Sequence, residues 1–319
     1  MGSRAGAFVA GAVVAASLLA PQPVEGQDGP PGPPKFPPGL HDRTLPPQNP
    51  FAGGDFTPPG HGPPGQASQA LQDPGDADGM SEEEVRVEGW TAPAASGSTP
   101  TAFGASLGQV WAGASYQPRA RRSDGHTGAA GAGFGLGNPR DWVGLDVGVY
   151  SFSTMSSGFG NRGGVDIHLH RLLPGGFALA AGWESAHHWG GAERDSGSSR
   201  YAVASKWLPL RAHSGLAFSS AALSLGVGDG RFLREADFHG DRTGANVFGS
   251  ASVRVLQPLS VLAEWTGQDL MLGTSVAPLR SHSLVLTAGV ADMTGAAGDG
   301  ARFVVGLSHG HDLLGSRGR

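Results

Sequence analysis

The sequence has no cysteine, few charged residues and no long apolar run after its first 20 residues. Without cysteine, disulfide scaffolds, cysteine zinc sites, iron–sulfur clusters and thiol catalysis are excluded. Charged residues are 15% of the 319, against about 25% in typical soluble domains. The chain therefore has few charges to cover the surface of a globular enzyme. The net charge of -5 gives no sign of a nucleic-acid-binding protein. No later stretch reaches the roughly 18 apolar residues that a membrane-spanning helix needs.

The first 26 residues have the pattern of a secretory signal peptide. Arg4 precedes an uncharged apolar run over residues 5–20, and Val24 and Gly26 occupy the -3 and -1 positions of a cleavage site before Gln27. A transmembrane anchor is the alternative, but this run is short for a hydrocarbon core of about 30 Å. The sequence therefore predicts a cleaved signal over residues 1–26 and export from the cytoplasm.

Residues 27–100 are rich in proline, glycine and acidic residues. Proline removes backbone donors and fixes φ, so neither a helix nor a strand ladder propagates through runs such as residues 30–34. Residues 1–100 carry a net charge of -7 and residues 101–319 a net charge of +2. We expect a disordered Pro/Gly-rich acidic linker over 27–100; a proline-rich docking ligand is the alternative.

Residues 101–319 alternate apolar and polar side chains with a period of two. Such alternation over many short segments predicts strands with one apolar face. Asp-Gly, Asn-Pro and Pro-Gly-Gly sequences between them are typical of hairpins and loops. No helical period of useful length is present. Alternating apolar faces include Val165, Ile167 and Leu169; Tyr201, Val203, Ser205 and Trp207; Val261, Ala263 and Trp265; and Phe303, Val305 and Leu307.

A soluble β-sandwich and a membrane barrel both produce this alternation, so the composition of the polar face must decide. That face is mostly Gly, Ala and Ser with about one charge per strand, which suits a narrow lumen better than a wetted surface. Tyr201 and Trp207, about 20 Å apart on one strand, are expected in the two interfacial aromatic girdles. The sequence predicts an all-β fold: an antiparallel up-and-down transmembrane β-barrel of about 10–12 strands over residues 101–319. Its lumen is expected to be narrow or plugged.

The charges of the polar face are the expected lumen residues. Two histidines of that face, His168 and His170, are two residues apart and could hold a metal with Asp166, but a polar lumen patch is favoured. Glu264 and Asp269 could form a glycosidase-like pair, although partners among the lumen cations are favoured. The expected lumen charges are Asp146, Asp166, Glu184, Lys206, Arg254, Glu264 and Arg302.

A Gly-Asp-Gly-Arg-Phe string at residues 228–232 recurs at residues 298–303 with one inserted residue. A duplicated ligand-binding loop is one interpretation. The favoured interpretation is a pair of hairpin turns in which Asp-Gly takes positive φ and the phenylalanine starts the next strand.

Four strings together resemble a family of uncharacterised bacterial outer-membrane β-barrel proteins that is common in cyanobacteria. The resemblance runs from about Gly135 to Gly310 and implies a fold and a location, with no catalytic residues to transfer. More loosely, the sequence is similar to barrel proteins associated with exopolysaccharide production. Barrels of this kind often end on an aromatic residue, whereas this chain ends Gly318-Arg319. The four strings are residues 225–232, 246–250, 264–270 and 298–303.

These observations predict a non-enzymatic protein of the cell outer membrane, either a narrow channel or a structural, envelope-associated barrel. Expected partners are membrane lipid, the outer-membrane assembly machinery and envelope polysaccharide, with no nucleic acid and no cofactor. The alternative is a secreted or periplasmic β-sandwich that binds envelope polysaccharide. A hydrolase of such polysaccharide, prompted by Glu264 and Asp269, is the third hypothesis.

Overall fold

The structure is a computed structural model in which twelve β-strands form one sheet. Residues 94–119, 125–151, 158–190, 198–211, 216–234, 237, 244–279, 283–296 and 300–314 are described. The first six strands are β1 (Gln109–Gln117), β2 (Thr127–Gly137), β3 (Gly144–Ser151), β4 (Gly163–Leu173), β5 (Phe177–Trp189) and β6 (Ser199–Pro209). The other six are β7 (Ser220–Gly228), β8 (Asn246–Leu256), β9 (Leu259–Trp265), β10 (Leu270–Val276), β11 (Leu284–Ala291) and β12 (Arg302–Asp312). The described residues also include two short 3-10 turns, η1 (Pro174–Gly176) and η3 (Gly230–Phe232).

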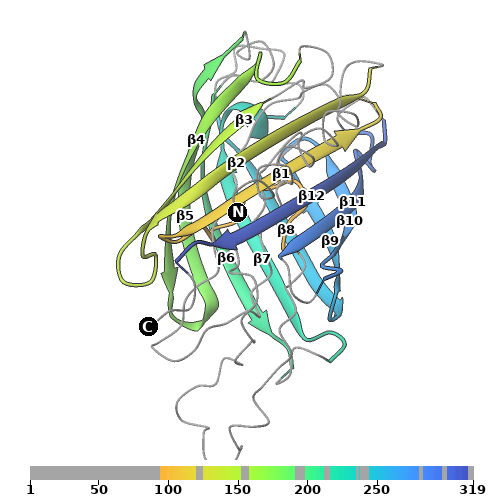
Figure 1. Cartoon of the computed structure of the whole chain (residues 1–319). Coiled ribbons are helices and arrows are strands. Elements are labelled where there is room, and N and C mark those ends of the chain that lie inside the picture. Colours follow the sequence, from red (N-terminus) through yellow and green to blue (C-terminus); the bar gives the residue numbers. More distant parts are fainter. Residues whose placement is uncertain are drawn as a thin grey trace, which may run out of the picture.

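Every strand pairs antiparallel with its neighbours in the sequence, and β1 closes the ring against β12 (Figure 1). Because the sheet has no free edge, all of its strands satisfy their backbone groups on both sides. The predicted up-and-down antiparallel barrel is therefore confirmed, with twelve strands. The β-sandwich alternative is wrong, because there is one closed sheet instead of two stacked ones. Among the described residues, no helix is long and apolar enough to cross a membrane.

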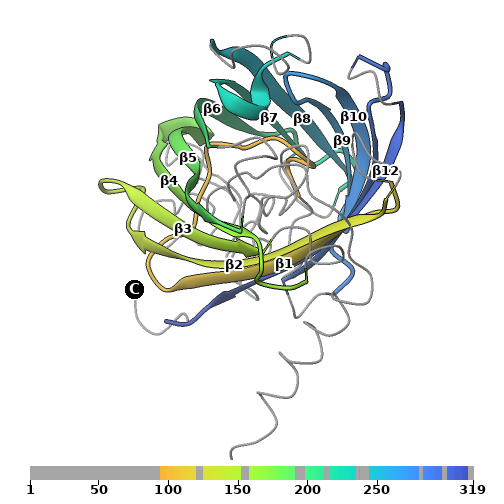
Figure 2. The ribbon, with the colours of Figure 1, turned by 90° about the horizontal axis from the view of Figure 1, so that it is seen from above.

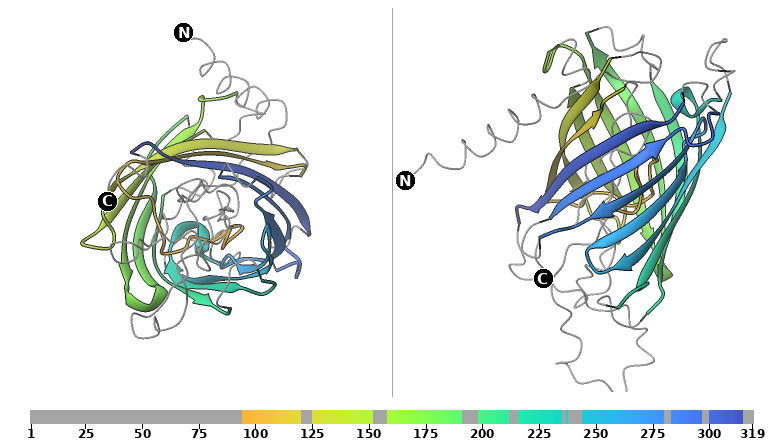
Figure 3. Two further views of the ribbon diagram at one scale, coloured as in Figure 1. Left: turned by 60° about the horizontal axis from the view of Figure 1, so that its bottom comes forward. Right: turned by 90° about the vertical axis from the view of Figure 1, so that its right-hand side faces the viewer.

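The two ends of the barrel differ in their connections. We call the end where β1 begins and β12 finishes the terminal mouth, and the opposite end the loop mouth. Connections at the terminal mouth have 2 to 10 residues, and those at the loop mouth have 4 to 17. The longest, residues 229–245, joins β7 to β8 and begins with η3. The strands run obliquely between the two mouths (Figures 1 and 3).

Most strands turn large apolar residues outward and small or polar residues inward. In β7, Leu223, Leu225 and Val227 are exposed on the outer face, while the serine and glycine residues between them are buried. The same pattern holds in β4, where Ile167 and Leu169 are outside and the polar residues between them are inside. Trp265 of β9, which the sequence places on the apolar face, is also outside.

Strand β6 reverses this pattern and corrects the sequence-based prediction. Tyr201, Val203 and Trp207 are 2–5% exposed and point into the barrel, so the two aromatics do not form interfacial girdles. The outer face of β6 instead carries small alanines and Lys206. The prediction failed because it assumed that the more apolar face always points outward.

Inward aromatic rings lie beside glycine on the adjacent strand. Trp111 pairs with Gly133, Tyr201 with Gly182, and Phe248 with Gly226 in the strand registers. A Cβ at any of these glycines would lie 2.1–2.3 Å from the ring atoms of its partner. Each glycine therefore provides the space that a large ring needs in a narrow interior. Such glycine–aromatic pairs are also a known device for fixing register in sheets.

Residues 94–106 lie inside the ring of strands and are all buried (Figure 2, orange). They belong to no strand and lead directly into β1. The boundary predicted at residue 100 falls in the middle of this segment, so residues 94–100 belong to the barrel and not to a linker. The rest of the predicted linker and the predicted signal peptide lie outside the described residues. We call residues 94–106 the inner segment.

Candidate functional site: the occupied barrel interior

Six of the seven expected lumen charges lie inside the barrel, where each is 1–4% exposed: Asp146, Asp166, Glu184, Arg254, Glu264 and Arg302. The seventh, Lys206, is on the outer face of β6. Its ammonium lies 3.8 Å from the centroid of the Phe177 ring and donates to the carbonyl of Gly175, close to the terminal mouth. Lys206 points outward because the alternation of β6 places Tyr201 and Trp207 inside.

Two ion pairs lie at the loop mouth. Arg302 Nη2 is 3.1 Å from Asp269 Oδ2, and Thr266 Oγ1 donates to the other oxygen of Asp269 at 3.0 Å. Arg231 Nε is 3.6 Å from Glu184 Oε2, and both side chains are buried. The predicted partnership between Asp269 and a lumen cation is thus present, and Glu264 and Asp269 contact different groups.

The first copy of the repeated string does not form the predicted hairpin turn. Arg231 and Phe232 lie in η3 and are buried, and the next strand begins only at Asn246. In the second copy, Phe303 does lie in a strand, on the outer face of β12. The two copies therefore share one feature, an arginine whose side chain reaches the barrel interior.

The inward histidines of β4 belong to a hydrogen-bonded aromatic group. The rings of His168 and His170 are stacked with centroids 5.3 Å apart, and His168 Nδ1 lies 2.5 Å from the Tyr201 hydroxyl. Asp166, the proposed third ligand, accepts the N–H of Ser185 at 2.5 Å. Over the described part of the chain, no three His, Asp or Glu side chains are grouped so that they could hold a metal ion.

The inner segment makes its tightest polar contacts at Ser98. Glu264 accepts hydrogen bonds from the N–H of Ser98, from its hydroxyl at 2.6 Å, and from the N–H of Thr99 at 3.1 Å. Arg231 Nη1 donates to the carbonyl of Ser98 at 3.3 Å. Ser98 is therefore held between one acidic and one basic side chain. Charge-assisted hydrogen bonds of this kind are stronger than neutral ones.

On either side of Ser98, the inner segment returns toward the terminal mouth. Ala94 N–H donates at 2.8 Å to Ser275 Oγ, which lies near the end of strand β10 at that mouth. Ala102 N–H donates to Ser205 Oγ at 2.7 Å. Ala105 N–H donates to Asp146 at 3.4 Å, near the beginning of β3. Both ends of the segment thus lie toward the same mouth, with Ser98 at its far point.

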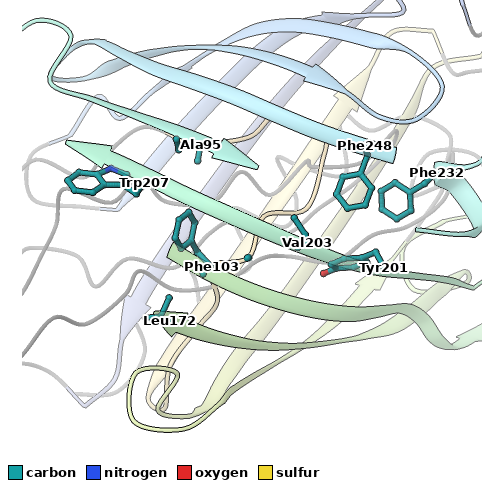
Figure 4. Packing of buried hydrophobic residues seen from close by; sticks show 11 residues of the cluster. Ala95, Phe103, Leu172, Tyr201, Val203, Trp207, Phe232 and Phe248 are labelled. Carbon is teal, nitrogen blue, oxygen red and sulfur yellow. The ribbon is translucent and has the colours of Figure 1, made fainter. Parts of the chain in front are cut away.

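Apolar packing holds the returning half of the inner segment. Phe103 is fully buried against Leu172 and Val203, in a cluster that extends to Phe248 and Phe232 (Figure 4). The rings of Phe232 and Phe248 are stacked with centroids 4.0 Å apart. Burying a phenylalanine side chain contributes roughly 1.5–3 kcal/mol, so Phe103 is the main apolar anchor of the segment.

Sequence reasoning missed the inner segment and Arg231. One signal was present: residues 89–118 contain no charged residue and are rich in Ala, Ser, Thr and Gly. Small uncharged residues fit a narrow interior, whereas a solvated linker gains nothing from excluding charge. Arg231 had no such signal, because its string is also typical of an exposed turn.

The fold and its interior define a closed up-and-down β-barrel whose own chain occupies the lumen. No known protein family matches the sequence, and no curated protein matches it. Among solved structures, the chain is similar to the outer membrane protein Omp33 of Acinetobacter baumannii, with 9% identity and a TM-score of 0.36. The match covers 64% of this chain and 96% of that one. At this level of likeness, the barrel's own geometry has to carry the functional proposal.

Proposed function

We propose that the protein is a non-enzymatic β-barrel of the bacterial outer membrane, with a narrow channel that the inner segment occupies. The observation that carries this proposal is the apolar outer face. Five strands contribute the outward side chains Leu169, Leu179, Leu225, Val247 and Phe303, which are 49–65% exposed. Soluble monomers rarely expose large contiguous apolar patches, whereas a membrane barrel turns such a band toward lipid.

Aromatic and cationic side chains near the two mouths support a transmembrane orientation. Phe177 and Lys206 pair on the outer face near the terminal mouth. Near the loop mouth, the Arg200 guanidinium lies 5.1 Å from the centroid of the Trp183 ring. Lysine and arginine extend along apolar surface toward a membrane interface, and aromatic girdles mark both interfaces of such barrels.

The connection lengths support one orientation in the membrane. Outer-membrane barrels have short periplasmic turns and longer extracellular loops. The terminal mouth, with connections of 2 to 10 residues, therefore faces the periplasm. The predicted signal peptide is consistent with delivery from that side.

The buried charges favour cations as the permeating ions. Among the described residues, six carboxylates are buried, Asp146, Asp166, Glu184, Glu264, Asp269 and Asp292, against three arginines, Arg231, Arg254 and Arg302. Carboxylate-lined pores select cations. Arg254→Glu is expected to increase the preference for potassium over chloride, read as a shift of the reversal potential in a salt gradient.

Membrane insertion is the first test of the proposal. The full-length protein is expected to need detergent to stay dispersed, to sediment with outer membranes, and to migrate differently on gels before and after boiling. A folded product that stays monomeric in buffer without detergent would contradict the proposal. Association with envelope polysaccharide and recognition by the assembly machinery stay predictions from the sequence resemblance.

A further inference from the structure

The inner segment differs from the barrel wall in how it is held. The described hydrogen bonds from its backbone N–H groups to the wall go to side chains, on Ser275, Glu264, Ser205, Asp146 and Gln109. The wall strands, by contrast, are joined by continuous ladders in which neighbouring strands have up to ten paired residues. A segment held by separate side-chain contacts can leave without breaking the sheet.

Both ends of the inner segment lie at the terminal mouth. Ala94 contacts the end of β10, and Ser106 N–H donates to Gln109 Oε1 at the start of β1. Residues 94–106 can therefore withdraw together through that one mouth. Its side chains are almost all small, and Phe103 is the large exception.

We propose that the inner segment is a movable plug that withdraws through the terminal mouth, with the contacts of Ser98 to Glu264 and Arg231 acting as its latch. This inference rests on the proposed channel function. The latch lies at the loop mouth, and Arg231 belongs to the longest connection there. A change in that connection alters the latch directly, so the side of the barrel opposite the exit controls the opening.

Engineered disulfides provide the test, because the chain has no cysteine of its own. Ala102→Cys with Ser205→Cys ties the plug to the wall, at a site where the Ala102 N–H already donates to Ser205. Ser205→Cys with Ser224→Cys is the matched control, because those hydroxyls are 2.8 Å apart on paired wall strands. Both full-length proteins are reconstituted in planar bilayers, and cross-linking is verified by mass.

The plug-to-wall pair is expected to open at least about tenfold more often when reduced than when oxidised. The wall-to-wall control is expected to open equally often in both states. Equal opening of the oxidised and reduced plug-to-wall pair would overturn the proposal. Failure of the proteins to insert at all would instead contradict the proposed membrane function, so the two failures are distinguishable.

The latch is tested separately by Glu264→Gln, which removes the negative charge that receives the Ser98 and Thr99 donors. Opening is expected to increase by about tenfold, since charge-assisted contacts are the stronger ones. Asp269→Asn is the control: Asp269 is a buried carboxylate of the same mouth whose partners are Arg302 and Thr266. If Glu264→Gln, folded and inserted, opens no more often than Asp269→Asn, the latch proposal is wrong.

Discussion

Strands β6 and β7 are neighbours with similar alternation in sequence, yet they turn their large side chains in opposite directions. β7 exposes Leu223, Leu225 and Val227 and buries serine and glycine. β6 buries Tyr201 and Trp207 and exposes alanines and Lys206. In their register, outward Ala204 pairs with outward Leu225. Small residues on one strand thus accompany large ones on the next.

The difference shows what decides which face of an alternating strand points into the barrel. On β6, the ring of Tyr201 has an internal hydrogen-bond partner in His168 and space over Gly182. The leucines of β7 need neither an internal hydrogen-bond partner nor a glycine on the adjacent strand, because an aliphatic side chain is stable against lipid. Alternation therefore locates a strand, while polar partners and adjacent glycines decide which face turns inward.

The largest effect is expected from placing a charge on the outer face of β7. Leu225→Arg should lower the free energy of unfolding by about 2–4 kcal/mol, the cost of an arginine at the bilayer midplane. Leu256→Arg, at the end of β8 near the terminal mouth, should cost only about 0–1 kcal/mol. Urea unfolding from lipid vesicles measures both. Equal costs at the two positions would argue against a lipid-facing band.

A smaller loss of stability is expected when a side chain fills the space beside an inward-pointing ring. Gly226→Ala places a Cβ 2.2 Å from the Phe248 ring, and such overpacking costs about 1–3 kcal/mol. Phe248→Leu in the same chain should recover part of the loss, so the double variant should be more stable than the sum of the two single changes predicts. Strict additivity would show that the pair does not share this space.

Tyr201→Phe removes one hydroxyl and tests whether the face of β6 that carries Tyr201 points into the barrel. Loss of its contact with His168 should cost about 0.5–1.5 kcal/mol. Tyr116→Phe, on the half-buried outer side of β1, is the comparison and should cost less. The opposite ranking in vesicle unfolding experiments would place Tyr201 at the lipid interface instead.

The smallest effect is expected at Lys206. Because its ammonium lies over Phe177 on the outer face, Lys206→Gln should cost at most about 1 kcal/mol. Arg254→Gln removes a charge that is 4% exposed inside the barrel, and it should cost more because its interior partners are left behind. Similar losses at both positions would suggest that Lys206 also faces the lumen.

Periodicity was enough to predict the barrel and which face of most strands points inward, because alternation and turn residues are local properties. It also located the inward positions of Asp146, Asp166, Glu184, Arg254, Glu264 and Arg302. It failed at Lys206 because direction in β6 depends on His168 and Gly182, which come from other strands. The plug and Arg231 were missed for the same reason, since the contacts that join them to the barrel are distant in sequence: Ser98 is 133 residues from Arg231 and 166 from Glu264.

The central claim is that the apolar outer faces, including Trp265, contact acyl chains while the face of β6 that carries Trp207 does not. Fluorescence quenching by brominated lipids tests it in two variants that each keep one of these tryptophans, with the others changed to phenylalanine and insertion verified by heat-modifiable mobility. The account predicts strong quenching of Trp265 and almost none of Trp207. Quenching of Trp207 with a protected Trp265 would contradict it.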